Sequence, residues 1–160
     1  VKVVTTPYDD KLYELNKRID KTYITYGSSE ARTEAVKKFD SEKHSVEAAP
    51  VEAKASRAIN KAINKYSYSK EDLVQAVENK EVSLKDVKEN ELPENIQKMS
   101  LKAREGYIQS IIDTRKEIRK EIIKVSKERE QYIIEQEKKG TAGKSEFDSA
   151  VSEVLKKQIK

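Results

Sequence analysis

Three isoleucine pairs, spaced eleven residues apart, are the feature that most limits what this chain can fold into. The pairs lie at Ile111–Ile112, Ile122–Ile123 and Ile133–Ile134, in a stretch that contains neither proline nor glycine. Eleven residues make three helical turns plus about 20°, so each column of isoleucines drifts only slowly around a helix. The spacing therefore predicts one long, nearly straight helix over residues 101–138, rather than a left-handed coiled coil.

The apolar face of this helix is wide enough to contact two neighbours. Measured from Ile111, one column of side chains lies within about 40° and a second column lies at about 100–140°. The first column contains Ile118, Ile122, Val125 and Ile133, and the second contains Ile112, Ile123 and Ile134. A two-stranded coiled coil needs only a narrow seam, so the second column predicts a second packing neighbour. The helix would be roughly 57 Å long, which predicts an elongated molecule.

The remaining segments predict an all-α fold. We expect helices at about 9–19, 29–66, 70–79 and 145–160, an extended lead-in at 1–8 and a linker at 140–144. Pro50 should kink or break the second helix near 47–50, because proline lacks the amide donor and clashes with the preceding turn. The inner face of that helix is rich in alanine, which allows close approach to the isoleucine face. The predicted architecture is an elongated antiparallel helical hairpin or bundle over 9–139, built on two long helices with short accessory helices.

Composition limits the classes of function. The chain of 160 residues is 39% charged and has no cysteine, which excludes disulfides, thiolate metal sites and cysteine nucleophiles. No run of about 18 apolar residues is present, so we expect no membrane span. The formal net charge is +4, from 33 basic and 29 acidic residues. This excess keeps a basic helical nucleic-acid-binding protein as an alternative, but acids and bases alternate along the long helix, which argues against nucleic acid as a partner.

No group of residues in the sequence carries a recognisable catalytic pattern. His44 is the only histidine, so a catalytic triad or a histidine-based metal site lacks partners. The chain has no phosphate-binding glycine loop, EF-hand loop or metalloprotease motif. The segment DSAVS at 148–152 misses the Asp-x-Ser-x-Ser adhesion signature because Ala150 stands at the position of the first serine. We therefore expect a non-enzymatic protein with no cofactor, no metal site and no small-molecule ligand.

Five side chains are candidates for an interaction or a structural polar role. Arg104, Arg115 and Arg129 project from the middle of the apolar face, at about 20°, 40° and 0° from Ile111. A guanidinium there must pair with a carboxylate or reach the helix edge. The acids expected to face it from the 29–66 helix are Glu34, Asp40, Glu42, Glu47 and Glu52. Such pairs would set the helix register or form an anion or partner site.

Tyr23 and Tyr26, the other two candidates, belong to a tyrosine cluster near the start of the chain. Tyrosines at a junction between an extended segment and helices are typical of packing with a solvated hydroxyl group, or of a protein-binding surface. Stacking of nucleic-acid bases on these rings is a third interpretation.

Four segments, in this order, carry a resemblance to a known family. They are PYDDKLYELNKRIDKTYITYG at 7–27, KEDLVQAV at 70–77, ELPENIQKMS at 91–100 and KEREQYI at 127–133. They resemble the helical region that follows the von Willebrand factor type A domain in a group of bacterial proteins. The resemblance implies an accessory helical module of a larger exported protein, located in the periplasm or at the cell surface. Its partner would be the adjacent domain of the same chain or another protein.

The resemblance also implies what this chain lacks. The type A domain and its metal-ion-dependent adhesion site would lie upstream, so no residue here inherits that site. VKVVTT at 1–6 would then be the junction with the preceding domain.

Overall fold

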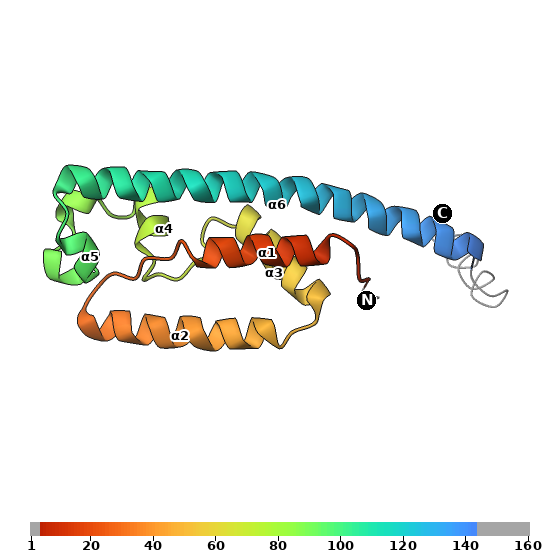
Figure 1. Ribbon diagram of the computed structural model, residues 1–160, viewed down its shortest axis with the longest axis horizontal. Helices are drawn as coiled ribbons and strands as arrows, with labels where there is room; N and C mark the ends of the chain where they lie inside the picture. The colour runs from red at the N-terminus through yellow and green to blue at the C-terminus, as the bar shows by residue number, and fades with distance from the viewer. Residues whose placement is uncertain (1–3, 144–160) are drawn as a thin grey trace.

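A computed structural model describes residues 4–143, and these residues are predominantly helical (Figure 1). The elements are α1 (Asp9–Asp20), α2 (Ser29–Glu47), α3 (Val51–Ile63), α4 (Leu73–Glu78), the 3-10 turns η1 (Leu84–Asp86) and η2 (Glu89–Glu91), α5 (Glu94–Gln97) and α6 (Leu101–Gly143). The all-α prediction is confirmed. Within the described residues there is no strand, only an isolated antiparallel bridge between Thr25 and Asp72. The helix predicted at 145–160 lies outside the described residues.

Helices α1, α3 and α6 pack together as the central part of the molecule. α1 lies along the middle of α6, and α3 contacts both of them (Figure 1). The buried side chains at this junction are Leu12, Leu15, Ile19, Ala55, Ala58, Tyr68, Ile118, Ile122 and Val125. The two alanines of α3, Ala55 and Ala58, are completely buried in this cluster. Each fully buried leucine or isoleucine contributes about 1.5–3 kcal/mol of stability.

A second hydrophobic core forms around the start of α6. It contains Ile24, Leu73, Val74, Leu84, Leu92, Ile96, Ile108 and Ile112. The short elements α4, η1 and α5 supply half of these side chains. None of the short elements is long enough to be stable alone, so each is held by burying one or two apolar residues on α6.

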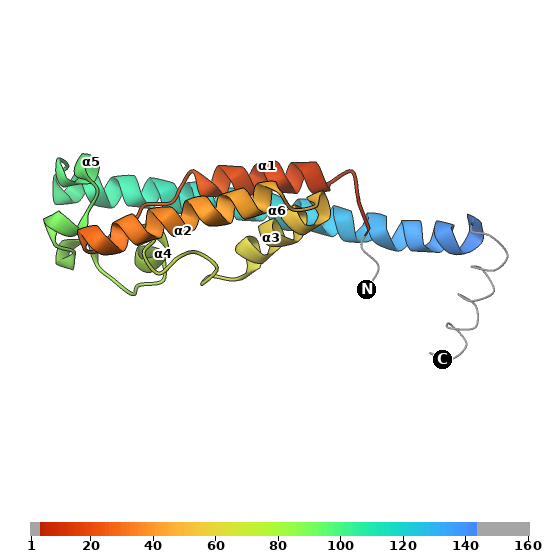
Figure 2. The ribbon, with the colours of Figure 1, turned by 90° about the horizontal axis from the view of Figure 1, so that it is seen from below.

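The segment 29–66 is broken at 48–50, where the sequence predicted a kink or break, and it forms two separate helices rather than one kinked helix. α2 ends at Glu47, and the chain turns back through 48–50 before α3 begins at Val51 (Figures 1 and 2). Pro50 has φ −58° and ψ 151°, an extended conformation that cannot continue a helix. Its missing amide donor costs no helical hydrogen bond, because Pro50 is the N-cap of α3, and its carbonyl accepts the amides of Ala53 and Lys54. The arrangement on two long helices is therefore not confirmed, since α2 has 19 residues and α6 has 43.

α6 is longer than predicted, and neighbouring elements bury fewer of its isoleucines than predicted. It extends through Gly143, so the predicted linker at 140–144 begins inside the helix. A glycine inside a helix costs only about 1 kcal/mol relative to alanine, which does not end a helix by itself. The second isoleucine column has a neighbour only at its start: Ile112 is buried, whereas Ile123 and Ile134 are 38% and 40% exposed. Figure 1 shows the C-terminal part of α6 extending beyond the start of α1.

No helix in residues 4–143 combines the length and the apolar character needed to cross a lipid bilayer.

Candidate functional site

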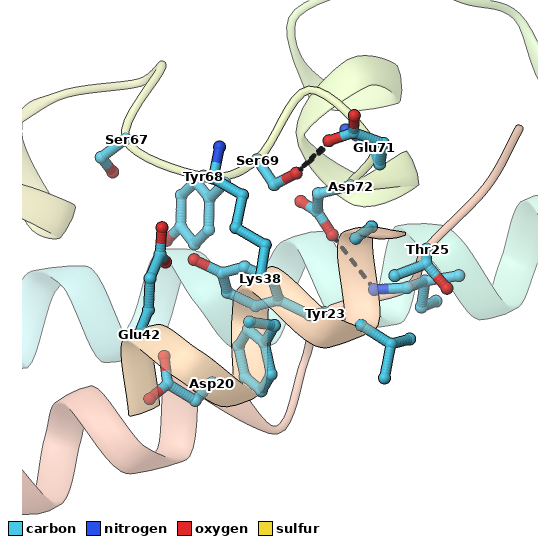
Figure 3. Close-up of a pocket in the computed structure, with 14 residues that line it drawn as sticks. Asp20, Tyr23, Thr25, Lys38, Glu42, Ser67, Tyr68, Ser69, Glu71 and Asp72 are labelled. Carbon is cyan, nitrogen blue, oxygen red and sulfur yellow. Dashed lines mark hydrogen bonds between the residues drawn. The ribbon is translucent and has the colours of Figure 1, made fainter. Parts of the chain in front are cut away.

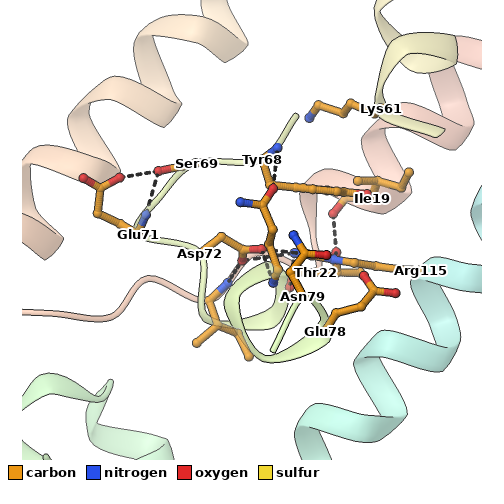
Figure 4. A network of polar contacts seen from close by, with 12 residues as sticks. Ile19, Thr22, Lys61, Tyr68, Ser69, Glu71, Asp72, Glu78, Asn79 and Arg115 are labelled. Carbon is orange, nitrogen blue, oxygen red and sulfur yellow. Dashed lines mark hydrogen bonds and ion pairs between the residues drawn. The ribbon is translucent and has the colours of Figure 1, made fainter. Parts of the chain in front are cut away.

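The centre of the molecule contains a completely buried arginine, Arg115 of α6 (Figure 4). Its Nη1 and Nη2 donate to the two carboxylate oxygens of Asp72, at 2.7 and 3.1 Å. Its Nε donates to Oγ1 of Thr22 at 2.7 Å, and Nη2 also donates to the Thr22 carbonyl at 3.1 Å. The guanidinium therefore exchanges its hydration for a bidentate ion pair and two further hydrogen bonds.

Two aromatic rings complete the surroundings of this guanidinium. Its Cζ lies 4.2 Å from the ring centroid of Tyr68 and 5.2 Å from that of Tyr23. The two rings are themselves 5.3 Å apart and tilted by 56°. Cation–π attraction is stronger when the cation is desolvated, as it is here.

Asp72 connects three segments at this point. Besides the guanidinium, its carboxylate accepts the backbone N–H of Gln75 at 2.9 Å, which caps the start of α4. It also accepts the backbone N–H of Ile24 at 3.1 Å, which fixes the extended segment between α1 and α2. With Arg115 on α6, the network joins the two hydrophobic cores.

The partners predicted for Arg104, Arg115 and Arg129 are wrong. Arg115 pairs with Asp72, Arg129 donates to Asp9 at 2.8 Å, and Arg104 lies 3.8 Å from Glu89 while donating to the carbonyls of Ile96 and Gln97. None of these acids belongs to 29–66. The reason is the reversal at Pro50, which places α2 away from α6, with α1 between them in the view of Figure 1. Acids on α2 are therefore too far from the apolar face of α6.

A second buried ion pair lies beside the first. Nζ of Lys61, on α3, is 2.6 Å from Oδ1 of Asp20, and the lysine is only 4% exposed. The ammonium also lies 4.9 Å from the ring centroid of Tyr23. Burial lowers the pKa of Lys61, and the neighbouring Asp20 carboxylate only partly opposes this effect. Burial likewise raises the pKa of Tyr23, so its phenol stays neutral at ordinary pH.

Outside these two ion pairs lies a cleft, which we call the α2 cleft (Figure 3). It is formed between α2 and the segment 67–72, and its volume is about 370 Å³. Its lining contains Asp20, Tyr23, Ile24, Thr25, Ala35, Val36, Lys38, Phe39, Glu42, Ser67, Tyr68, Ser69, Glu71 and Asp72. Clefts of this size accept a small molecule or one or two side chains of a partner.

The five candidate residues do not form one site. Arg115 and Tyr23 belong to the central network, and Tyr23 also lines the α2 cleft. Tyr26 packs against the second core, where burial raises its pKa, and its backbone N–H donates to the Glu71 carbonyl at 2.9 Å. Arg104 holds the end of α5, and Arg129 holds the start of α1.

Sequence reasoning missed Asp72, Lys61, Tyr68 and Glu71. Asp72 directly precedes an apolar pair, which is a recognisable helix-cap signal, but its partner Arg115 lies 43 positions away. Lys61 occupies one position of a helix rich in small residues, and no local pattern marks it as buried. Within the described residues, no three side chains of the types that bind metals come together.

A scan against protein-family models gives no match, and searches of curated proteins and of solved structures give none either.

Proposed function

We propose that this chain is a non-enzymatic helical structural and protein-interaction module of a larger exported protein that carries a von Willebrand factor type A-like domain. The observation that carries the interaction role is α2. Ala35 is the only buried residue among its 19. A helix that buries so little apolar surface contributes little to the stability of the body. It is available instead as a surface for a partner.

A second surface supports the same proposal. The helix α6 carries two large, apolar and exposed side chains, Ile123 beside α1 and Ile134 beyond it. This part of α6 is fixed to the start of α1, because Arg129 donates to Asp9 at 2.8 Å and the rings of Tyr8 and Tyr132 meet edge to face at 6.1 Å. The helix therefore presents its exposed isoleucines in a defined direction relative to the body.

The association with a type A domain, and with export, depends on the resemblance of the four quoted segments. The sequence upstream of Val1 in the intact gene product tests it directly. A type A domain with an Asp-x-Ser-x-Ser site there would support the proposal, and an unrelated upstream sequence would contradict this part of it.

Hydrogen–deuterium exchange tests the interaction role. The exchange of this chain alone is compared with its exchange inside the intact gene product. We expect added protection in α2 or in 123–139, and unchanged exchange in α1 and α3, whose buried faces are already protected. Equal exchange over α2 and 123–139 in both samples, with and without other components of the cell envelope, would refute the interaction role.

A further inference from the structure

The α2 cleft has two walls of different construction. One wall is the face of α2 that carries Ala35, Phe39 and Glu42, and the other is the segment 67–72 before α4 (Figure 3). Tyr23 and Tyr68 form its floor, with Arg115 on their inner side. The cleft thus combines aromatic rings with carboxylates at its edges.

The lining groups of the cleft that are not paired with a buried cation carry a net negative charge. Four carboxylates and one ammonium group, that of Lys38, line it. Asp72 and Asp20 are neutralised from behind by the buried cations Arg115 and Lys61. The carboxylates that remain for a ligand are those of Glu42 and Glu71, on opposite walls.

Both remaining carboxylates are at least partly exposed to solvent. A hydrogen bond from the Ser69 hydroxyl lowers the pKa of Glu71. Glu42 lies 3.4 Å from Arg57, but the two side chains are 47% and 37% exposed. Exposed pairs of this kind contribute about 0.2–1 kcal/mol, so a ligand cation can compete with Arg57 for the carboxylate.

The aromatic groups of the cleft favour a cation as well. The outer ring, Phe39, lies 5.0 Å from Tyr23 at an interplanar angle of 46°. The inner rings, Tyr23 and Tyr68, already contact Arg115 and Lys61, whereas Phe39 contacts no cation among the described residues. A planar guanidinium can stack on such a ring while it donates to carboxylates at the ring edge.

Two residues of the lining also carry a polar atom that lacks a partner. Oγ of Ser67 and the hydroxyl of Tyr68 are buried and make no hydrogen bond within the described part of the chain. A buried hydroxyl without a partner costs about 1–3 kcal/mol, and a donor or acceptor on a bound ligand would remove this cost.

We propose that the α2 cleft binds an arginine side chain of a partner protein, with the guanidinium stacked on Phe39 and paired with Glu42 and Glu71. This inference deepens the proposed function, on which it rests, by naming the chemistry that the partner must present. Arginine fits better than lysine because its planar group satisfies the ring and two carboxylates together.

The test titrates the complete chain with N-acetyl-L-arginine methylamide and follows backbone amide signals by NMR. The matched control ligand is N-acetyl-L-citrulline methylamide, which has the same shape but no charge. We expect saturable shifts confined to 35–42 and 67–72 with the arginine probe, and binding at least about fivefold weaker with the citrulline probe. Equal binding of the two probes, or no saturable shift with arginine, would overturn the inference.

Two variants locate the site. Glu42→Gln and Phe39→Leu should each weaken the arginine probe by about two- to fivefold. Glu34→Gln is the matched control, because it removes the same charge from the same helix at a side chain that is 77% exposed and outside the cleft lining. If Glu34→Gln weakened binding of the arginine probe equally, the effect would come from the overall charge of the protein, and the proposed site would be refuted. Thermal melting confirms that each variant is folded.

The two proposals fail separately. Probe binding without added exchange protection in the intact protein would retain the arginine site and remove the proposed interaction with the adjacent domain. Protection of α2 without probe binding would retain the interaction role and remove the arginine site.

Discussion

Replacing Arg115 by methionine tests whether the central network holds the two cores together. Methionine has a similar length and no charge, so the change removes the guanidinium with little change in volume. It leaves the Asp72 carboxylate buried, with only the backbone N–H groups of Ile24 and Gln75 as donors. A buried charge without its counter-ion is one of the few single changes with a large effect on stability.

The expected loss follows from the geometry of the pair. Breaking a buried, hydrogen-bonded ion pair by removing one partner costs about 3–5 kcal/mol. The Thr22 hydroxyl also loses the donor that lies 2.7 Å away, although it keeps its own bond to the Ile19 carbonyl. A domain of this size has a free energy of unfolding of about 5–15 kcal/mol, so the variant should lose a large part of it. The corresponding decrease in Tm is about 6–20 °C.

Urea and thermal unfolding, followed by circular dichroism, measure this loss. Lys120→Met is the matched control on the same helix, because its pair with Glu117 is 3.6 Å long and both side chains are 76% exposed; it should change stability by less than about 0.5 kcal/mol. The double variant Arg115→Met with Asp72→Asn should lose about 0.5–3 kcal/mol less stability than the two single variants lose together. A loss below about 1 kcal/mol for Arg115→Met alone, or strict additivity, would refute the role given to this pair.

Four further substitutions test other parts of the structure. Burial holds the pKa of Lys61 below its usual value of 10.5, so the unfolded chain binds more protons than the folded one just below pH 10.5. The stability of the wild type relative to Lys61→Met should therefore rise as the pH increases toward 10.5, which pH-dependent urea titrations measure; a flat difference would contradict it. Burial works against the ionised form of Asp9, but hydrogen bonds including that from Arg129 outweigh it and leave the pKa below 3.8. Asp9→Asn should therefore lose about 1–3 kcal/mol at neutral pH, and the difference should shrink as the pH falls below 3.8, as acid unfolding curves will show. Gly27 has φ +116°, so Gly27→Ala should cost about 1–3 kcal/mol, whereas Gly106→Ala, in an open helical position, should stabilise the chain by about 0.4–1 kcal/mol; thermal melts compare the two.

The long helix could be predicted from sequence because its signal is local. The isoleucine spacing and the absence of proline are properties of one segment, and they define α6 from Leu101 onward. How far other helices cover α6 is not determined by its local sequence. Whether Ile123 has a neighbour depends on where the chain reverses, and the sequence of α6 contains no information about that reversal.

The candidate site could be predicted only in part for the same reason. The position of Arg115 in the apolar face correctly marked it as a residue that needs a counter-ion, and it is completely buried. Its counter-ion could not be identified, because many carboxylates lie along the chain and only the tertiary fold selects Asp72. The α2 cleft was missed altogether, since its two walls belong to α2 and to the segment 67–72, which are far apart in the sequence.

The way α2 is attached connects the fold to the proposed function. Its start is held by Arg32, which donates to the carbonyls of Leu92 and Asn90 at 3.2 Å, and its far half by the contact between Glu42 and Arg57. These attachments are polar and exposed or half-buried, so each contributes little and is weakened by salt. The central network does the opposite, because Arg115 and Asp72 are shielded from solvent and join the two cores. A partner that binds in the α2 cleft therefore competes only with the weak contact between Glu42 and Arg57, and binding there leaves the part of the molecule that keeps the chain folded undisturbed.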